Sequence, residues 1–204
     1  MSSIKLTADS GGGTVEFKAP PTTTSNAAKV ITLSQNPGMI TQVVQSSDTT
    51  STGSFSLTTA GTYYDHTLMT VAITPASASN KILISCLGMG EGSEDDHKIR
   101  WRIKRAISGG ATTYIQGTAS GSRIPVISTI STSYHGDDNL TTPSTFGLSN
   151  YLDSPSTTSA ITYTVQMESS SSSETWYYNS SKADNDEDYS ERGISYITVM
   201  EVAG

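Results

Sequence analysis

A two-residue alternation of apolar and polar side chains governs most of the chain after Phe55. In its clearest example, residues 97–104, three apolar side chains alternate with four cationic ones. Successive residues of a β-strand point to opposite sides, so this segment has one face for a core and one for water. Residues 161–167 repeat the pattern. Further strands are expected at 69–73, 82–87, 113–115 and 195–202.

Turn-forming residues separate these segments, and no window has the apolar spacing of a helix. The chain contains 34 Ser and 30 Thr among 204 residues, with 17 Gly and 7 Pro. Serine and threonine compete for backbone hydrogen bonds in helices, and β-branched threonine favours strands. The sequence therefore predicts an all-β protein whose head, residues 46–204, is an antiparallel sandwich or barrel.

Residues 1–45 differ in amino-acid composition and pattern from the head. Glycine and proline runs separate short apolar pieces there, which offer too little area to offset the entropy of ordering the chain. We expect an extended arm that becomes ordered on another surface or on copies of itself, with a floppy tail as the alternative. The apolar candidates for attachment are Ile4, Leu6, Val15, Phe17, Val30, Ile31 and Leu33.

Charge and composition exclude several classes of partner. The formal net charge of -7 argues against nucleic acid, which needs a field of Lys and Arg. No window approaches the roughly 20 apolar residues of a membrane span, and no secretory signal opens the chain, so we expect synthesis in a cytoplasm and no membrane insertion. The single cysteine, Cys86, excludes an intrachain disulfide and is expected to be a buried apolar residue.

One acidic segment offers oxygen ligands of the kind that calcium binds. Its candidates are Asp184, Asp186 and Asp188, followed by Glu191. The segment lacks the glycine and the distant glutamate of a calcium loop, so a solvated loop is the favoured interpretation. His66, His97 and His135 have no close pair spacing, although a symmetric assembly could gather copies of one histidine on its axis. We expect no cofactor.

Two loop regions are candidates for recognition of a sugar or a protein surface. They combine flat aromatic side chains with adaptable hydrogen-bonding groups. The alternative is that the aromatic side chains fill the core or pack between subunits. The candidate receptor contacts are Trp176, Tyr177, Tyr178, Asp137, Asp138 and Asn139. No nucleophile elbow and no glycine loop leading into a helix is present, so an enzyme is not predicted.

Three segments together resemble known phage proteins. Residues 4–20 with 26–33 resemble the N-terminal segment of many tailed-bacteriophage fibre and virion proteins, particularly those of marine and freshwater phages. Residues 151–155 and 193–202 look like the C-terminal head of the same group. The resemblance implies a jelly-roll head, similar in shape to tumour necrosis factor and C1q, that assembles as a homotrimer with its N-terminal arm attached to the virion.

This resemblance implies a virion structural protein of the tail-fibre kind, whose head contacts the host surface. The implied partners are other copies of the chain, tail or capsid proteins, and a host-surface glycan or protein. The chain has no long shaft, so a short fibre or a capsid cement or decoration protein is the alternative, and a glycan-degrading enzyme is less favoured. An apolar fraction of 34% is low for a lone sandwich, which also favours oligomerisation.

Overall fold

The structure is a computed structural model that describes residues 3–7, 14–18, 37–49, 52–94, 98–131, 143–188 and 190–204. These residues form strands and no helix. The chain divides into two units, Met1–Gln35 and Asn36–Gly204. The strands are β1 (Ser3–Thr7), β2 (Thr14–Lys18), β3 (Ile40–Asp48), β4 (Gly53–Leu57), β5 (Tyr64–Ile73), β6 (Lys81–Gly92), β7 (Lys98–Ile107), β8 (Thr112–Ile115), β9 (Ser128–Ser131), β10 (Ser144–Asp153), β11 (Ile161–Ser169), β12 (Glu174–Tyr178) and β13 (Ser195–Val202).

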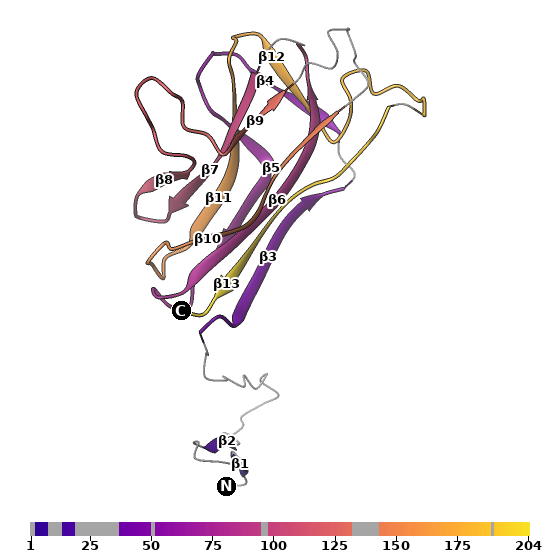
Figure 1. The fold of residues 1–204 in the computed structure, drawn as a ribbon. Coiled ribbons are helices and arrows are strands. Elements are labelled where there is room, and N and C mark those ends of the chain that lie inside the picture. Colours follow the sequence, from indigo (N-terminus) through magenta and orange to yellow (C-terminus); the bar gives the residue numbers. More distant parts are fainter. Residues whose placement is uncertain are drawn as a thin grey trace. The chain divides into compact units, whose positions relative to one another are not determined.

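Two antiparallel sheets form the larger unit, the head (Figure 1). The first, here called the β6 sheet, contains β3, β13, β6 and β10, with β12 and β4 continuing it at the end of β6. The second, the β7 sheet, contains β5, β11 and β7, with β8 and β9 both paired to β7.

The strand order is that of a jelly roll. The first strand of the head, β3, pairs with the last, β13, and β5 pairs with β11. The strands that lie next to each other are thus far apart in the sequence, as wrapping of a long ribbon around two sheets requires. The predicted all-β, antiparallel jelly-roll sandwich is confirmed.

The head begins earlier than the sequence indicates. Strand β3 starts at Ile40 and pairs along its length with β13, so residues 40–45 belong to the head and not to the arm. The sequence of residues 40–45 does not by itself identify a strand of the head, because the strand that pairs with it, β13, lies at the other end of the chain.

The N-terminal unit contains a hairpin of β1 and β2. Its register pairs Ile4 with Phe17, Leu6 with Val15, and Lys5 with Glu16. Apolar positions thus lie opposite apolar positions, and opposite charges lie opposite each other. This part of the expected arm is thus paired with itself in a hairpin.

Large aromatic rings fill the centre of the head. Trp101, Phe146 and Trp176 are buried, with ring centroids 5.1 Å apart for the first pair and 6.1 Å for the second. Room for them comes from β6, whose glycines stand on its inner side: a Cβ on Gly88 would overlap the Phe146 ring, and one on Gly90 would lie 2.6 Å from Trp176 Cζ2. The glycine-rich end of β6 is therefore a packing device.

Polar contacts join the two sheets along both of their sides. On one side, Ser46 Oγ of β3 donates to the Leu68 carbonyl of β5 at 3.3 Å. On the other, Asp153 of β10 accepts from Arg105 Nη1 at 2.6 Å and from Tyr163 Oη at 2.8 Å. Burial, followed by the charge of Asp153, raises the pKa of Tyr163, which therefore remains a donor.

Buried glutamates fasten the loops that leave the sheets. Glu201 accepts from the Ala76 amide and from Asn80 Nδ2, both at 2.6 Å, and Glu174 accepts from the Ser93 amide at 2.5 Å. Each carboxylate satisfies loop donors that would otherwise lack a partner away from water.

A run of four serines, residues 170–173, connects β11 to β12 and thereby joins the two sheets. Strand β11 belongs to the β7 sheet and β12 to the β6 sheet. The run therefore crosses the sandwich and does not join neighbouring strands.

The packing of Trp176 against Gly90 predicts that Gly90→Val destabilises the head. The added branched side chain would meet the Tyr177 carbonyl oxygen, which lies closest to the Cβ position, as well as the buried indole. We expect a cost of about 1–3 kcal/mol in the free energy of unfolding. Chemical denaturation checks this result. Ser56→Val, at an exposed position of β4 in the same sheet, is the control and should change the free energy little; equal effects would contradict the packing account.

Candidate functional site

The outer face of the β6 sheet is the candidate functional surface. On β6 itself, Ile82, Ile84 and Cys86 are buried on the inner side, so Leu83 and Ser85 between them face outward. The burial of Cys86 is as predicted, and it raises the pKa of the thiol to about 11.

Four apolar residues lie in register across this face. Val43 of β3 pairs with Met200 of β13, Met200 pairs with Leu83 of β6, and Leu83 pairs with Leu152 of β10. We call Val43, Met200, Leu83 and Leu152 the apolar row. Its outer members are open to solvent, Val43 at 57% and Leu152 at 46% exposure.

The neighbouring positions of this face are neutral on one side of the row and include the exposed Lys81 on the other, where it pairs with Val202. Ile40, 51% exposed, pairs with Val202 and extends the row on one side. On the other side Gln45 and Thr198 share a hydrogen bond of 2.7 Å, from Gln45 Nε2 to Thr198 Oγ1. The face thus combines exposed apolar side chains with hydroxyl and amide groups.

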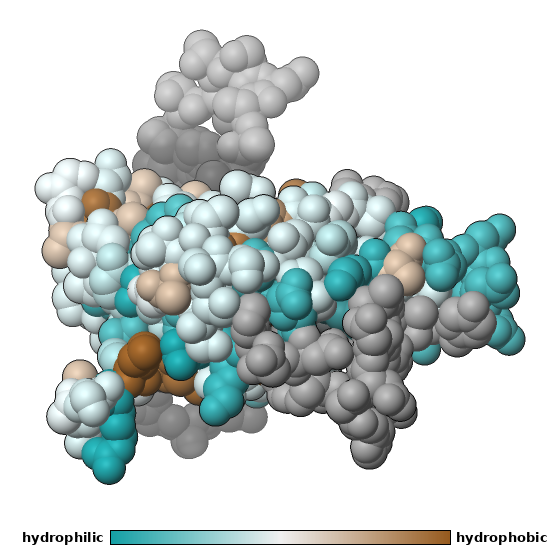
Figure 2. Space-filling model, turned by 90° about the horizontal axis from the view of Figure 1, so that it is seen from above, coloured by the Kyte–Doolittle hydropathy of each residue, from teal (hydrophilic) through white to brown (hydrophobic). Residues whose placement is uncertain are grey.

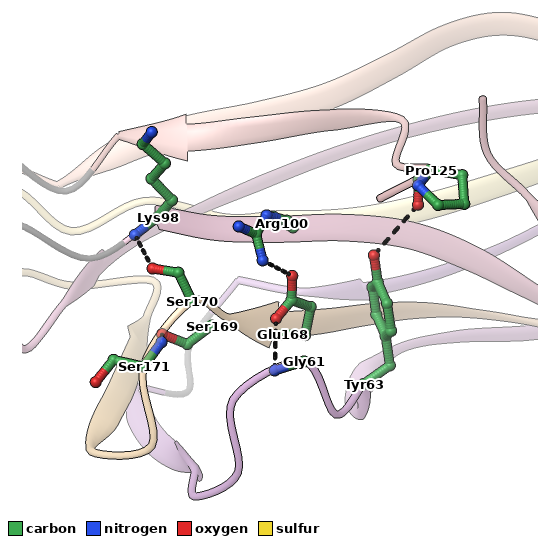
Figure 3. A network of polar contacts seen from close by, with 9 residues as sticks. All are labelled: Gly61, Tyr63, Lys98, Arg100, Pro125, Glu168, Ser169, Ser170 and Ser171. Atoms are coloured by element: carbon green, nitrogen blue, oxygen red, sulfur yellow. Dashed lines mark hydrogen bonds and ion pairs between the residues drawn. The ribbon is translucent and has the colours of Figure 1, made fainter. Parts of the chain in front are cut away.

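The outer face of the β7 sheet has the opposite character, because charged side chains cover it in pairs. Arg100 Nη1 donates to Glu168 Oε1 at 2.6 Å, and Glu168 Oε2 accepts from the Gly61 amide at 3.1 Å (Figure 3). Lys104 pairs with Asp65. The cationic side chains of β7, predicted to face water, are thus balanced by carboxylates of β5 and β11.

Trp176, predicted to contact a receptor, lies in the core. Its side chain is fully buried between the sheets, and it packs on Phe146 and beside Gly90. A side chain in that position cannot contact a receptor, so this part of the prediction is wrong and the alternative of a core aromatic holds for Trp176. The sequence of 176–178 alone does not reveal which residue points inward.

The two neighbouring tyrosines, Tyr177 and Tyr178, are half-buried. The Tyr178 ring lies 5.6 Å from the ring of His66, which the Phe55 ring approaches from 5.2 Å. The predicted aromatic recognition cluster is therefore in part a packing cluster around a buried histidine.

The predicted contacts Asp137, Asp138 and Asn139 lie outside the described residues. The end of the head that contains β4 and β12 is shown in Figure 2, where most of the coloured surface is white or teal and brown is confined to small areas. This end therefore lacks a broad apolar surface among the residues that are described there.

The acidic segment is held by an ion pair. Asp184 accepts from Arg192 Nε at 2.8 Å and from Arg192 Nη2 at 2.9 Å. Asp186 and Asp188 are exposed. In the described parts of the chain, no three His, Cys, Asp or Glu side chains are grouped to hold a metal ion.

The predicted attachment residues of the arm are only partly described. Ile4, Leu6, Val15 and Phe17 occupy paired positions of the β1–β2 hairpin. Val30, Ile31 and Leu33, as well as His97 and His135, lie outside the described residues. Among the strands and loops that are described, no helix is long and apolar enough to cross a membrane.

Burial of His66 predicts an acid-sensitive head. The side chain is 1% exposed and its Nε2 has no hydrogen-bond partner among the described residues. Burial lowers the pKa of His66 from 6.5 to about 4, against the opposing charge of Asp48. The unfolded chain therefore binds a proton that the folded chain does not, and the free energy of unfolding falls as pH drops from 6.5 to 4.

Between pH 6.5 and 4 the free energy of unfolding should fall by about 3 kcal/mol, since each unit of pKa shift corresponds to about 1.4 kcal/mol. Denaturant titrations of the protein and of His66→Phe at several pH values check it, because the variant keeps the aromatic packing and loses the proton site. The variant should show a shallower pH dependence below 6.5. Identical profiles for the two proteins would contradict the assignment.

No family model matches the chain, and no curated protein matches it. Two solved structures are similar to it, each 11% identical: a structure of the Gx strain of infectious bursal disease virus, at a TM-score of 0.42, and T=1 particles derived from infectious bursal virus, at 0.43. Each match covers 94% of this chain and 43% of the other, so this chain spans less than half of theirs. The fold assignment above depends on the strand order and not on these similarities.

Proposed function

We propose that this chain is a bacteriophage virion structural protein of the fibre kind, a homotrimer held together by the outer face of the β6 sheet. The arm attaches the trimer to the virion, and the head contacts the host surface. The sequence resemblance of residues 4–33 and 193–202 supports the phage origin. The apolar row is the observation that carries the assembly part.

A row of exposed apolar side chains across four strands costs free energy in a lone subunit. Fully burying one side chain of the size of valine or leucine contributes about 1.5–3 kcal/mol. Val43 and Leu152 stand at the two edges of the face and are about half exposed. Contact with further copies would cover them, and cyclic symmetry would repeat this gain at each subunit contact.

The neutral groups along one side of the apolar row support the same use. Gln45, Thr198 and Ser85 flank the apolar row with neutral groups. Removing a neutral polar group from water costs less free energy than removing a charged one, and neutral groups can form hydrogen bonds within an interface. The charged outer face of the β7 sheet would remain in water.

The hairpin in the N-terminal unit supports an attachment role for the arm. Two-stranded hairpins are marginally stable alone in water. The register that pairs Ile4 with Phe17 and Leu6 with Val15 concentrates apolar positions opposite each other. A surface of a tail or capsid protein would supply the partner that such a hairpin needs.

The assembly proposal predicts that a charged β6-sheet face abolishes the trimer. Sedimentation equilibrium of the unchanged protein should give three times the chain mass of 21.5 kDa. Val43→Lys with Leu152→Lys should give the single-chain mass with the strand content of circular dichroism retained, because the added charges would be buried in the contact.

The control adds the same charge elsewhere, as Thr112→Lys with Thr118→Lys, at exposed positions of β8 and the loop after it. It should remain trimeric. A monomeric unchanged protein, or a trimer that survives the Val43 and Leu152 changes, would contradict the proposal.

The host-contact part has its own test. Purified trimer added to host cells before infection should reduce phage adsorption, because the heads occupy the receptors. Unaltered adsorption, together with recovery of heat resistance when the protein is added back to stripped capsids, would replace the fibre function by capsid decoration.

A further inference from the structure

The outer face of the β7 sheet carries a stack of three planar groups that the assembly does not use. The guanidinium Cζ of Arg102 lies 3.6 Å from the ring centroid of Tyr63 and 3.6 Å from that of Tyr114. The three residues come from the loop before β5, from β7 and from β8. The arginine is thus held between two tyrosine rings, a geometry in which both faces of the guanidinium attract an aromatic ring.

Hydrogen bonds fix the middle of the stack. Arg102 Nε donates to Gln166 Oε1 at 2.9 Å, and Arg102 Nη1 donates to Gln116 Oε1 at 3.3 Å. Gln166 Nε2 in turn donates to Asp65 Oδ1 at 2.7 Å, and Asp65 also pairs with Lys104. The guanidinium plane is therefore set by amides on both sides, and its orientation sets that of the rings.

The inner end of the stack is anchored as well. The Tyr63 hydroxyl donates to the Pro125 carbonyl at 3.4 Å, which ties the ring to the loop between β8 and β9 (Figure 3). Burial is the main cause that raises the pKa of Tyr63 and lowers the pKa of Arg102, as expected for groups partly withdrawn from water.

The outer end of the stack is open. Tyr114 is 43% exposed although Arg102 covers one side of its ring. No hydrogen bond joins its hydroxyl to another described residue, whereas Tyr63 has one. A large aromatic side chain is thus held against Arg102 at the surface, and the Gln116 amide binds the same guanidinium. Lys104, the partner of Tyr114 in the strand register, extends its ammonium to Asp65.

We infer that Tyr114 is the platform of a carbohydrate-binding site, which takes one pyranose ring of a surface glycan on its open face. A pyranose has an apolar C–H face that packs on a flat aromatic ring and a rim of hydroxyls that needs hydrogen-bond partners. Tyr114 provides the first, and the amide of Gln116 contributes to the second. Because these side chains are ordered before the sugar arrives, little rotamer entropy is lost on binding.

The charge balance favours a sugar over a protein partner. Arg100 and Lys104 are already paired with Glu168 and Asp65, and Arg102 is engaged by two rings and two amides. The face offers one exposed ring in a polar surrounding, and an interface core between proteins needs a broader apolar area. This inference deepens the host-contact part of the proposed function and is independent of the trimer contact, which lies on the other sheet.

Saturation-transfer NMR on the full chain tests the site with defined probes: the methyl pyranosides of glucose, galactose, mannose and N-acetylglucosamine. At least one should receive saturation, strongest at the C–H groups of one ring face. Tyr114→Ala should weaken its binding at least tenfold, and Tyr114→Phe should keep it within about threefold, because the platform survives.

Tyr151→Ala is the matched control, since Tyr151 is also exposed, at 41%, but lies on β10 of the other sheet. It should bind like the unchanged protein. Arg102→Lys keeps the charge and removes the planar group, so it should weaken binding by releasing Tyr114, and the Tyr114 ring resonances should broaden or shift. Circular dichroism establishes that each variant is folded.

Binding of none of the four pyranosides would overturn the inference, as would binding that Tyr114→Ala leaves unchanged. Either result would leave the mass of the assembly as measured by sedimentation, so a failure here is distinguishable from a failure of the trimer. Protection of host cells by the trimer without any sugar binding would assign host contact to a protein receptor at another place.

Discussion

In a two-layer sandwich every strand points alternate side chains into the core and the others outward. The outward side chains must contact water, form ion pairs or pack against another surface. The two sheets of this head meet this constraint differently. The β7 sheet pairs its charges, Arg100 with Glu168 and Lys104 with Asp65. The β6 sheet presents the apolar row instead. The difference between these faces underlies both the proposed assembly and the proposed sugar site.

The core and the contacts between the sheets hold the head together without help from the outer faces. Trp101, Phe146 and Trp176 fill the space beside the glycines of β6, and Asp153 ties the sheets together through Arg105 and Tyr163. The head therefore has its own core and its own cross-sheet contacts. The proposed subunit contact would therefore add to a head that already has a core of its own.

The alternation of apolar and polar residues is sufficient to predict the strands in which it is strict. It does not predict features that depend on residues from distant parts of the chain. Strands β7 and β11 follow from residues 97–104 and 161–167. The polar side of β11 does not face water as expected, because Thr164 and Gln166 are buried by side chains of the neighbouring strands. For Trp176 the sequence leaves both a receptor contact and a core position open, because nothing near it in the chain signals the space left by Gly90. The apolar row was not predicted, since Val43, Leu83, Leu152 and Met200 come from four separate segments and meet only through the jelly-roll register. The stack around Arg102 was missed for the same reason.

The most direct test of a buried β6-sheet face is the distance between spin labels on neighbouring copies. A nitroxide at Ser47→Cys would stand on the outer side of β3, four residues along the strand from Val43, and the buried thiol of Cys86 would stay unlabelled. Pulsed dipolar spectroscopy should give one narrow distribution of short intermolecular distances, shorter than that from a label at Thr112→Cys on β8. The same long or unresolved distances at both positions would contradict the account.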